Sequence, residues 1–171
     1  LSDALAVSFD PHVGHDFIED AEDRFEFYHR VEEKLEFDLE MFNQITKGGL
    51  PKKTLNICLA GTGVGKSLFM CHQAAAALSI NKNVLYITLE MAEERIAERI
   101  DANLLDVPIS QLEEIPRDMY KKKIEKLKGK TKGKIIIKEY PTASASAMHF
   151  KNLLSSILHS PNLSILSILY F

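Results

Sequence analysis

The sequence predicts an α/β fold in which helices cover a parallel β-sheet. Two observations lead to this fold class. Short apolar segments rich in β-branched residues alternate with longer segments whose apolar residues recur every three or four positions. A glycine-rich turn also stands between the first such strand and the helix after it. Strands joined by helices lie parallel, and the 171 residues suffice for one domain with a full hydrophobic core.

Residues 1–36 are expected to lie ahead of the sheet, as an N-terminal segment and a linker helix. Residues 1–15 contain the breakers Pro11 and Gly14 and are predicted to be irregular. Residues 16–35 are predicted to form a charged helix with one apolar stripe. The stripe consists of Phe17, Ala21, Phe25, Tyr28, Val31 and Leu35. Such a stripe must pack either on the chain's own domain or on a neighbouring subunit.

Residues 37–171 are expected to form a partial α/β domain. A short helix is predicted over 37–45 and a turn over 47–51. The predicted strands cover residues 54–60, 84–89, 133–140 and 163–171. The predicted helices cover residues 66–80, 92–105 and 143–159, with one more that begins at a capping box formed by Ser110 and Glu113.

The glycine-rich turn is the most informative feature of the chain. Its residues are Ala60, Gly61, Thr62, Gly63, Val64, Gly65, Lys66 and Ser67. A strand, a turn and a helix in this order direct backbone N–H groups and the helix dipole at one anion. Lys66 can reach the β- and γ-phosphates of ATP, and Ser67 can ligate Mg²⁺. The first position is alanine where the strict pattern has glycine, which leaves a chance glycine turn as the alternative.

Glu90 follows the predicted strand 84–89 and is the second candidate site residue. The helix between strands 54–60 and 84–89 predicts a right-handed crossover, and ligands of such sheets bind at the carboxyl ends of the strands. Glu90 is therefore expected at the same edge as the glycine-rich turn. A carboxylate there can orient and deprotonate an attacking water. A solvated carboxylate at the end of a strand is the alternative.

The charges of the chain are segregated, although the net charge is only −3. Residues 16–40 contain eleven acidic and three basic residues, and residues 117–138 contain ten basic and two acidic ones. The basic run either contacts DNA phosphates, which would make binding salt-dependent, or is the solvated face of a helix.

Cysteines and histidines give weaker signals. Cys58 and Cys71 lie among apolar neighbours, which predicts buried, reduced thiols in a cytoplasmic protein. His12 and His15 stand near Asp10 and Asp16, but no helical or strand spacing supports a metal site over solvated loop residues. No apolar run approaches the roughly 18 residues that a membrane span needs, so no membrane partner is expected.

The segments around the turn and Glu90 resemble DnaB-type replicative helicases, which have a RecA-type ATPase core. The similarity is carried by Gly48-Gly49-Leu50-Pro51 before the turn, by Leu89-Glu90-Met91, and by alanine in the first place of the loop, which is usual in that family. It extends over residues 9–16, 45–49, 53–56, 84–87, 90–94 and 99–107, and is nearest to the helicases of T-even-type bacteriophages. The resemblance implies a three-layer RecA-like P-loop NTPase core with a parallel sheet.

The resemblance also implies an activity. Such helicases form ring hexamers, hydrolyse ATP with Mg²⁺, move along single-stranded DNA and unwind the duplex at the phage replication fork in the bacterial cytoplasm. They cooperate with a primase and a helicase loader. By similarity Glu90 is the catalytic base, Lys66 contacts the phosphates, Ser67 holds the metal, and the stripe of residues 16–35 packs on an adjacent subunit.

The C-terminal residues depart from the family pattern. The family has a strand that ends in an aspartate near the Mg²⁺, whereas residues 161–171 contain no carboxylate. We therefore expect an internal fragment with a core that is incomplete at the C-terminus, and a truncated gene or a reading-frame slip near residue 161. Such a chain is expected to bind ATP but hydrolyse it poorly. The alternatives are a RecA-type recombinase or regulatory ATPase, or a non-catalytic truncated product.

Overall fold

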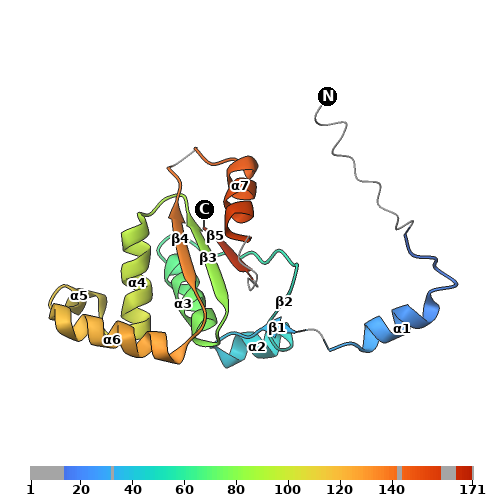
Figure 1. Cartoon of the computed structure of the whole chain (residues 1–171), viewed down its shortest axis with the longest axis horizontal. Coiled ribbons are helices and arrows are strands. Elements are labelled where there is room, and N and C mark those ends of the chain that lie inside the picture. Colours follow the sequence, from blue (N-terminus) through green and yellow to red (C-terminus); the bar gives the residue numbers. More distant parts are fainter. Residues whose placement is uncertain (1–13, 32, 142–143, 159–164, 171) are drawn as a thin grey trace. The chain divides into compact units, whose positions relative to one another are not determined.

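The computed structural model describes residues 14–31, 33–141, 144–158 and 165–170 (Figure 1). The chain divides into two compact units, residues 1–33 and 34–171. The expectations for residues 1–13, 161–164 and 171 lie outside the described residues. None of the helices in the described part is both long enough and apolar enough to cross a bilayer.

The first unit contains one helix, α1 (Ala21–His29), within its described residues, and none of the α1 residues is buried. The predicted helix 16–35 is therefore too long. The Asp16 carboxylate accepts hydrogen bonds from the backbone N–H groups of Ile18 and Glu19, at 2.9 Å each. A side chain that bonds the nearby backbone in this way competes with a helix, so residues 16–20 form turns instead. The helix ends where Arg30 takes an extended conformation.

The second unit begins with a small hairpin-like element that the sequence pattern did not indicate. Strand β1 (Lys34–Leu35) pairs antiparallel with β2 (Leu50–Pro51), and α2 (Glu40–Thr46) lies between them in the chain. The predicted helix 37–45 starts too early. The Asn43 side chain bonds both the backbone N–H and the backbone carbonyl of Phe37, at 2.8 Å each, which keeps residue 37 outside the helix.

The parallel sheet follows the prediction for three of its strands. In the described residues its order is β4 (Ile135–Glu139), β3 (Asn83–Thr88) and β5 (Ile165–Tyr170), and both outer strands run parallel to β3. Strand β3 is buried along almost its whole length, as the central strand of a covered parallel sheet should be.

Helices α3 (Lys66–Ser79) and α4 (Glu93–Leu105) pack against each other and against the sheet (Figure 1). The small residues Ala74, Ala75 and Ala77 of α3 are buried and allow close approach to β3. The core cluster also contains Cys71, Val84, Tyr86, Ile96 and Ile100. The remaining helices are α5 (Ile109–Leu112), α6 (Arg117–Lys130) and α7 (Ala147–Leu158).

The predicted strand 54–60 is wrong. These residues have no regular secondary structure, and all of them are exposed, including Leu55, Ile57 and Leu59. An apolar, β-branched sequence becomes a strand only when its backbone N–H and carbonyl groups find partners on another strand. Within the described residues β5 pairs only with β3, and no strand lies at its other edge. The predicted crossover from strand 54–60 is therefore also absent from the described structure.

The capping box predicted at Ser110 is also wrong. Ser110 lies inside α5, and Pro108 is the residue that precedes the first helical turn. Pro116 precedes α6 in the same way. Both prolines have φ near the value that their rings impose, which suits the entry to a helix, so they set the boundaries in place of a serine cap.

Candidate nucleotide-binding site

The glycine-rich turn leads directly into α3. Gly63 and Gly65 have φ angles of 76° and 103°, a region that residues with a Cβ rarely adopt. Gly65 is the N-cap of α3, and its carbonyl accepts the first helical hydrogen bond, from the N–H of Phe69 at 2.9 Å. A glycine at this position puts no side chain over the helix N-terminus. The backbone can therefore approach an anion closely.

Open space surrounds this turn. A Cβ added at Gly63 or Gly65 would meet no atom within 4 Å. The residues from Ala60 to Val64 are exposed, and Lys66 and Ser67 at the start of α3 are half-buried. The turn thus offers backbone groups, a lysine and a serine hydroxyl around one open space at a helix N-terminus.

The start of α3 and the end of β3 lie at the same end of the sheet. A tight turn at Asn81, with a φ of 63°, reverses the chain between α3 and β3, so the two elements run in opposite directions (Figure 1). By their residue counts α3 is about 21 Å long and β3 about 20 Å long. The Sγ of Cys71 lies 3.8 Å from the hydroxyl oxygen of Tyr86, which aligns the two elements side by side.

Glu90 lies just beyond β3, in a bend, and is exposed. The strand ends at Thr88, whose side chain is completely buried. The Thr88 hydroxyl accepts a hydrogen bond from the N–H of Met91 at 3.0 Å and donates one to the Met91 carbonyl at 2.9 Å. Met91 itself packs on the core cluster. Glu90 therefore occupies the apex of a short turn whose two ends are fixed.

Glu93, at the start of α4 and three residues after Glu90, contacts the end of β4. One of its carboxylate oxygens accepts a hydrogen bond from the N–H of Glu139 at 2.9 Å and lies 3.5 Å from the Nζ of Lys138. The Tyr140 N–H donates to the Thr88 carbonyl at 2.9 Å. Sequence reasoning did not identify Thr88 or Glu93. The only signal was their position just before and just after Leu89-Glu90-Met91, which does not reveal a contact with β4.

The two cysteines differ in environment. Cys71 is buried, as predicted, and burial raises the pKa of its thiol, while the hydrogen bond to Tyr86 and the charge of Arg99 partly oppose that rise. Cys58 is exposed, so the prediction of a buried thiol is wrong for that residue. The reason is the same as for the predicted strand 54–60, because Cys58 belongs to that unpaired segment.

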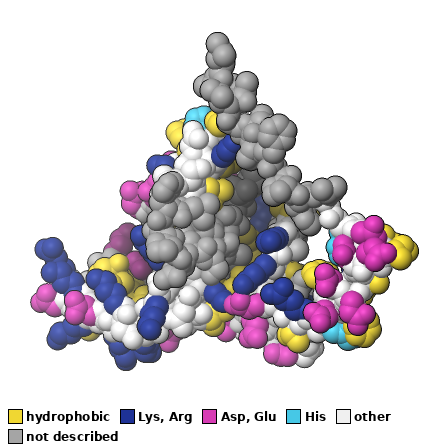
Figure 2. Space-filling view, turned by 45° about the vertical axis from the view of Figure 1, so that its right-hand side comes forward, with side chains coloured by type: hydrophobic (Ala, Val, Ile, Leu, Met, Phe, Trp, Pro, Cys, Tyr) yellow, Lys and Arg dark blue, Asp and Glu magenta, His cyan; other side chains and the backbone are white. Residues whose placement is uncertain are grey.

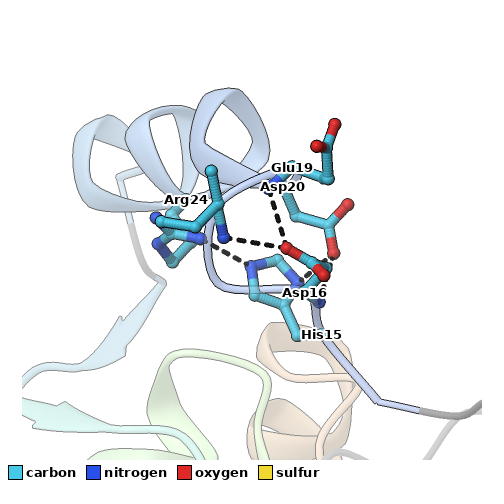
Figure 3. A network of polar contacts seen from close by, with 6 residues as sticks. His15, Asp16, Glu19, Asp20 and Arg24 are labelled. Atoms are coloured by element: carbon cyan, nitrogen blue, oxygen red, sulfur yellow. Dashed lines mark hydrogen bonds and ion pairs between the residues drawn. The ribbon is translucent and has the colours of Figure 1, made fainter.

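His15 takes part in a network within the first unit (Figure 3). Its Nδ1 lies 3.2 Å from a carboxylate oxygen of Asp20, and its Nε2 lies 3.3 Å from the guanidinium of Arg24. Both ring nitrogens therefore face protein groups. Over the described residues no group of three or more His, Cys, Asp or Glu side chains has the arrangement of a metal site. His12 and Asp10 lie outside the described residues.

The basic run of residues 117–138 covers α6 and continues into β4. No residue of α6 is buried, and Lys and Arg side chains gather at the lower left of Figure 2, where α6 lies in Figure 1. Two contacts hold the helix to α4: the Tyr120 hydroxyl donates to Asp101 at 2.8 Å, and the Nζ of Lys123 donates to the carbonyl of Leu105 at 2.8 Å.

Comparison with known proteins gives two findings. Residues 35–170 match the DnaB-like helicase C terminal domain, a domain with a RecA-like fold. A DnaB-like replicative helicase of Enterobacteria phage T4 is 46% identical over 160 residues, which cover 92% of this chain and 34% of that relative. The chain thus spans about a third of the relative's length. With a match over most of its residues, the chain belongs to the DnaB-like helicase family.

Proposed function

We propose that this chain carries the ATP-binding loop and the catalytic base of a ring-type replicative helicase, which unwinds duplex DNA at a phage replication fork. The observation that carries the proposal is the relation between two elements. The glycine-rich turn opens α3 at the end of the sheet where β3 leads into Glu90. Membership of the DnaB-like family supports the helicase over a recombinase or a regulatory ATPase.

The residues of the turn fit a triphosphate. Gly63 and Gly65 adopt positive φ angles beside open space that side chains at these positions would fill. In our proposal the backbone from Ala60 to Ser67 binds the phosphates, Lys66 neutralises the β- and γ-phosphate charge, and the Ser67 hydroxyl holds Mg²⁺. The bound Mg²⁺ would polarise the phosphates and offset charge that develops on them during transfer.

Glu90 would act as the general base. It is exposed at the apex of its turn, and in our proposal its carboxylate orients a water molecule in line with the terminal phosphate. The contacts of Thr88 and Glu93 fix the backbone on both sides of it. A base held in this way loses little freedom when it orients the water.

A polypeptide of these 171 residues alone is expected to bind Mg·ATP weakly and to hydrolyse it slowly. An arginine lent by a neighbouring subunit contributes roughly 10³ to 10⁵ in rate in such enzymes, and an isolated chain would have no neighbour to supply it. Residues 161–171 also offer no carboxylate for the metal. The three-layer arrangement of a RecA-like core is likewise part of the proposal.

The partners belong to the proposal as well. We infer that the chain self-associates as the family's ring hexamers do, that the ring encloses single-stranded DNA, and that a primase and a helicase loader act with it in the host cytoplasm. The exposed aromatic side chains of α1 support a contact with another copy in this proposal.

Binding of a fluorescent ATP analogue in the presence of Mg²⁺ tests the proposal. We expect Lys66→Ala to raise the dissociation constant about tenfold or more, since a charge-assisted contact to phosphate is lost. Lys122→Ala removes a lysine from the exposed face of α6 and serves as the matched control, with affinity unchanged. Glu90→Gln should leave affinity within about threefold and remove the residual hydrolysis.

Two outcomes would contradict the proposal. Unchanged affinity of the Lys66→Ala variant would show that the turn does not bind the phosphates. Rapid hydrolysis by the 171-residue chain, abolished by Lys66→Ala, would show that the site needs neither the neighbour's arginine nor a further carboxylate.

A further inference from the structure

Thr88 makes an unusual set of contacts for a residue at the end of a strand. Its side chain is 0% exposed, and both functions of its hydroxyl are used on one residue, Met91, as acceptor from the N–H and donor to the carbonyl. Its own carbonyl accepts the N–H of Tyr140 from the neighbouring chain segment. Thr88 therefore links the end of β3 by hydrogen bonds to the segment after β4 and to Met91.

The hydrogen bonds of Thr88 restrain the two residues that lie between Thr88 and Met91. Leu89 and Glu90 bridge Thr88 to Met91, and Met91 packs on the hydrophobic core. With both ends of a four-residue turn held, the backbone of Glu90 has few conformations to explore. Its side chain is exposed, so the restraint on the backbone determines where the carboxylate starts.

We propose that Thr88 is a positioning residue for Glu90: its buried hydroxyl closes the turn that aims the Glu90 carboxylate at the nucleotide site. The inference rests on the proposed function, since it assumes that Glu90 is the base. Thr88 itself touches neither nucleotide nor water in this role. Its effect passes through the backbone of Met91.

The chain offers a matched control for this role in Thr131. The Thr131 hydroxyl also donates to a carbonyl, that of Leu78, and accepts a backbone N–H, that of Gly133. It links the end of α3 to the segment before β4, at the opposite end of the sheet from Glu90. Thr131→Val thus removes the same kind of bonds as Thr88→Val without touching the turn.

The test uses the full 171-residue chain with ¹³C-carboxyl-labelled glutamate and Mn²⁺ bound to a non-hydrolysable ATP analogue. The ¹³C carboxyl resonance that is missing from the spectrum of Glu90→Gln belongs to Glu90. The paramagnetic relaxation of this resonance by Mn²⁺ reports how close the carboxylate lies to the metal and how uniform its position is. Amide hydrogen exchange at Met91 reports the turn itself, with or without nucleotide. Affinity for the analogue is measured for each variant.

In Thr88→Val we expect the Met91 amide to exchange about tenfold faster or more. The relaxation of Glu90 should fall while affinity for the analogue stays unchanged. Thr88→Ser keeps the hydroxyl and should behave as the natural chain does, and so should Thr131→Val. A purely structural threonine would affect stability in both valine variants alike and leave Glu90 relaxation untouched.

Wild-type relaxation of Glu90 in the valine variant would overturn the inference. If Thr88→Val does not fold, Thr88→Ser decides: loss of Glu90 relaxation despite the retained hydroxyl would equally overturn it. Failure of the proposed function looks different. In that case Mn²⁺ fails to relax Glu90 in the natural chain while it relaxes the Ser67 amide, or the analogue does not bind at all, and the positioning role falls with it.

Discussion

The thiol of Cys71 donates a weak hydrogen bond to the hydroxyl of Tyr86, with 3.8 Å between the two atoms. Both side chains are buried, and the contact joins the middle of α3 to the middle of β3. Lys66 precedes Cys71 by about 7 Å of helix, and Thr88, where β3 ends just before Glu90, follows Tyr86 by about 7 Å of strand. Because the two elements are antiparallel, both distances run toward the same end of the sheet.

This contact predicts unequal reactivity of the two thiols. Burial raises the pKa of Cys71, so its thiol stays protonated at neutral pH and is shielded from reagents. Cys58 is exposed in the segment before the glycine-rich turn. In a time course with an aromatic disulfide reagent, we expect one thiol to react quickly and the second only on unfolding. Cys58→Ser should remove the fast phase, and a fast phase that survives this change would refute the assignment.

The raised pKa of Cys71 also makes the stability of the fold depend on pH. A thiol with a raised pKa in the folded state binds its proton more tightly there than in the unfolded chain. Its contribution to stability is therefore complete below the unfolded pKa of about 8.5 and is lost as the pH rises above it. In Cys71→Ala, the alkaline part of the stability profile should be flatter than in the natural chain, as measured by urea unfolding between pH 7 and 10.

The glycine-rich turn gives a third prediction. Gly65→Ala forces a Cβ into a left-handed conformation at the helix N-cap, a strain of roughly 1–2 kcal/mol, although the added atom meets nothing within 4 Å. We expect the fold to survive and affinity for Mg·ATP to fall about tenfold or more, because in the proposed site the added methyl would lie where the phosphates approach. The measurement is a titration with a fluorescent ATP analogue.

Gly129→Ala is the matched control for that change. Gly129 lies within α6, has no positive φ, and also has open space around an added Cβ. Alanine there should stabilise the helix by about 0.5–1 kcal/mol and leave nucleotide affinity unchanged. Equal loss of affinity in both variants would mean that the turn has no special role.

Sequence periodicity predicted best the two elements that flank a clear turn. The predicted helix 66–80 and strand 84–89 agree with α3 and β3 to within a residue, because apolar spacing and the turn at Asn81 define them. Strand 54–60 failed for a physical reason. Its sequence is as apolar as that of β3, but a strand also needs a partner, and no local pattern tells which edge supplies one.

The candidate site shows the same division. The glycine-rich turn could be proposed from the sequence because its chemistry requires particular residue types at fixed spacing, and Glu90 because it follows a predicted strand. Thr88 and Glu93 could not, because their roles depend on contacts with Met91 and with residues of β4 that lie some 45 positions further along. A buried threonine and an acidic residue in a first helical turn are common in any α/β protein.

The pair of Asp101 and Tyr120 predicts a pH effect on stability. Burial raises the pKa of Asp101, and the hydrogen bond from Tyr120 partly opposes that rise. The folded state therefore binds the proton more tightly than the unfolded chain, so this group makes the protein more stable as the pH falls through the raised pKa toward 3.8. The cost of its buried charge is complete at neutral pH.

Two variants separate the two causes. Asp101→Asn removes the charge, so its stability relative to the natural chain should be most favourable at neutral pH and decline on acidification. Tyr120→Phe removes the hydrogen bond that lowers the pKa of Asp101. The increase in stability on acidification should therefore begin at a higher pH. Urea unfolding between pH 4 and 7 measures both, and parallel profiles for all three proteins would exclude the effect.

The lysines of α6 are predicted to form a solvated face rather than a DNA-binding surface. Their side chains lie on several sides of a helix that buries none of its residues, and Lys123 is used to contact the Leu105 carbonyl. If the lysines bound a phosphate backbone, the affinity for DNA would fall steeply with salt concentration. We expect Lys121→Glu and Lys122→Glu together to leave any affinity of this chain for fluorescent single-stranded DNA at low salt unchanged, and a reduced affinity would reverse this conclusion.

The last prediction concerns α1 and self-association. Phe25 and Tyr28 lie on the predicted apolar stripe and are 61% and 71% exposed, whereas Phe27 is equally exposed, at 61%, on another side of the same helix. Figure 2 shows acidic side chains around this helix. The apolar stripe among them stays in contact with water unless it packs on another apolar surface. If the stripe packs on a second copy, each buried aromatic ring contributes roughly 1.5–3 kcal/mol.

Sedimentation velocity over a range of concentrations measures this contact. Phe25→Ser should weaken self-association about tenfold or more, since most of a buried ring's contribution is lost. Phe27→Ser removes the same side chain from the other side and should change self-association less than about threefold. Equal effects of the two variants would indicate non-specific association through exposed aromatic rings. Undiminished self-association after removal of residues 1–35 would show that copies of the chain meet through the α/β unit instead.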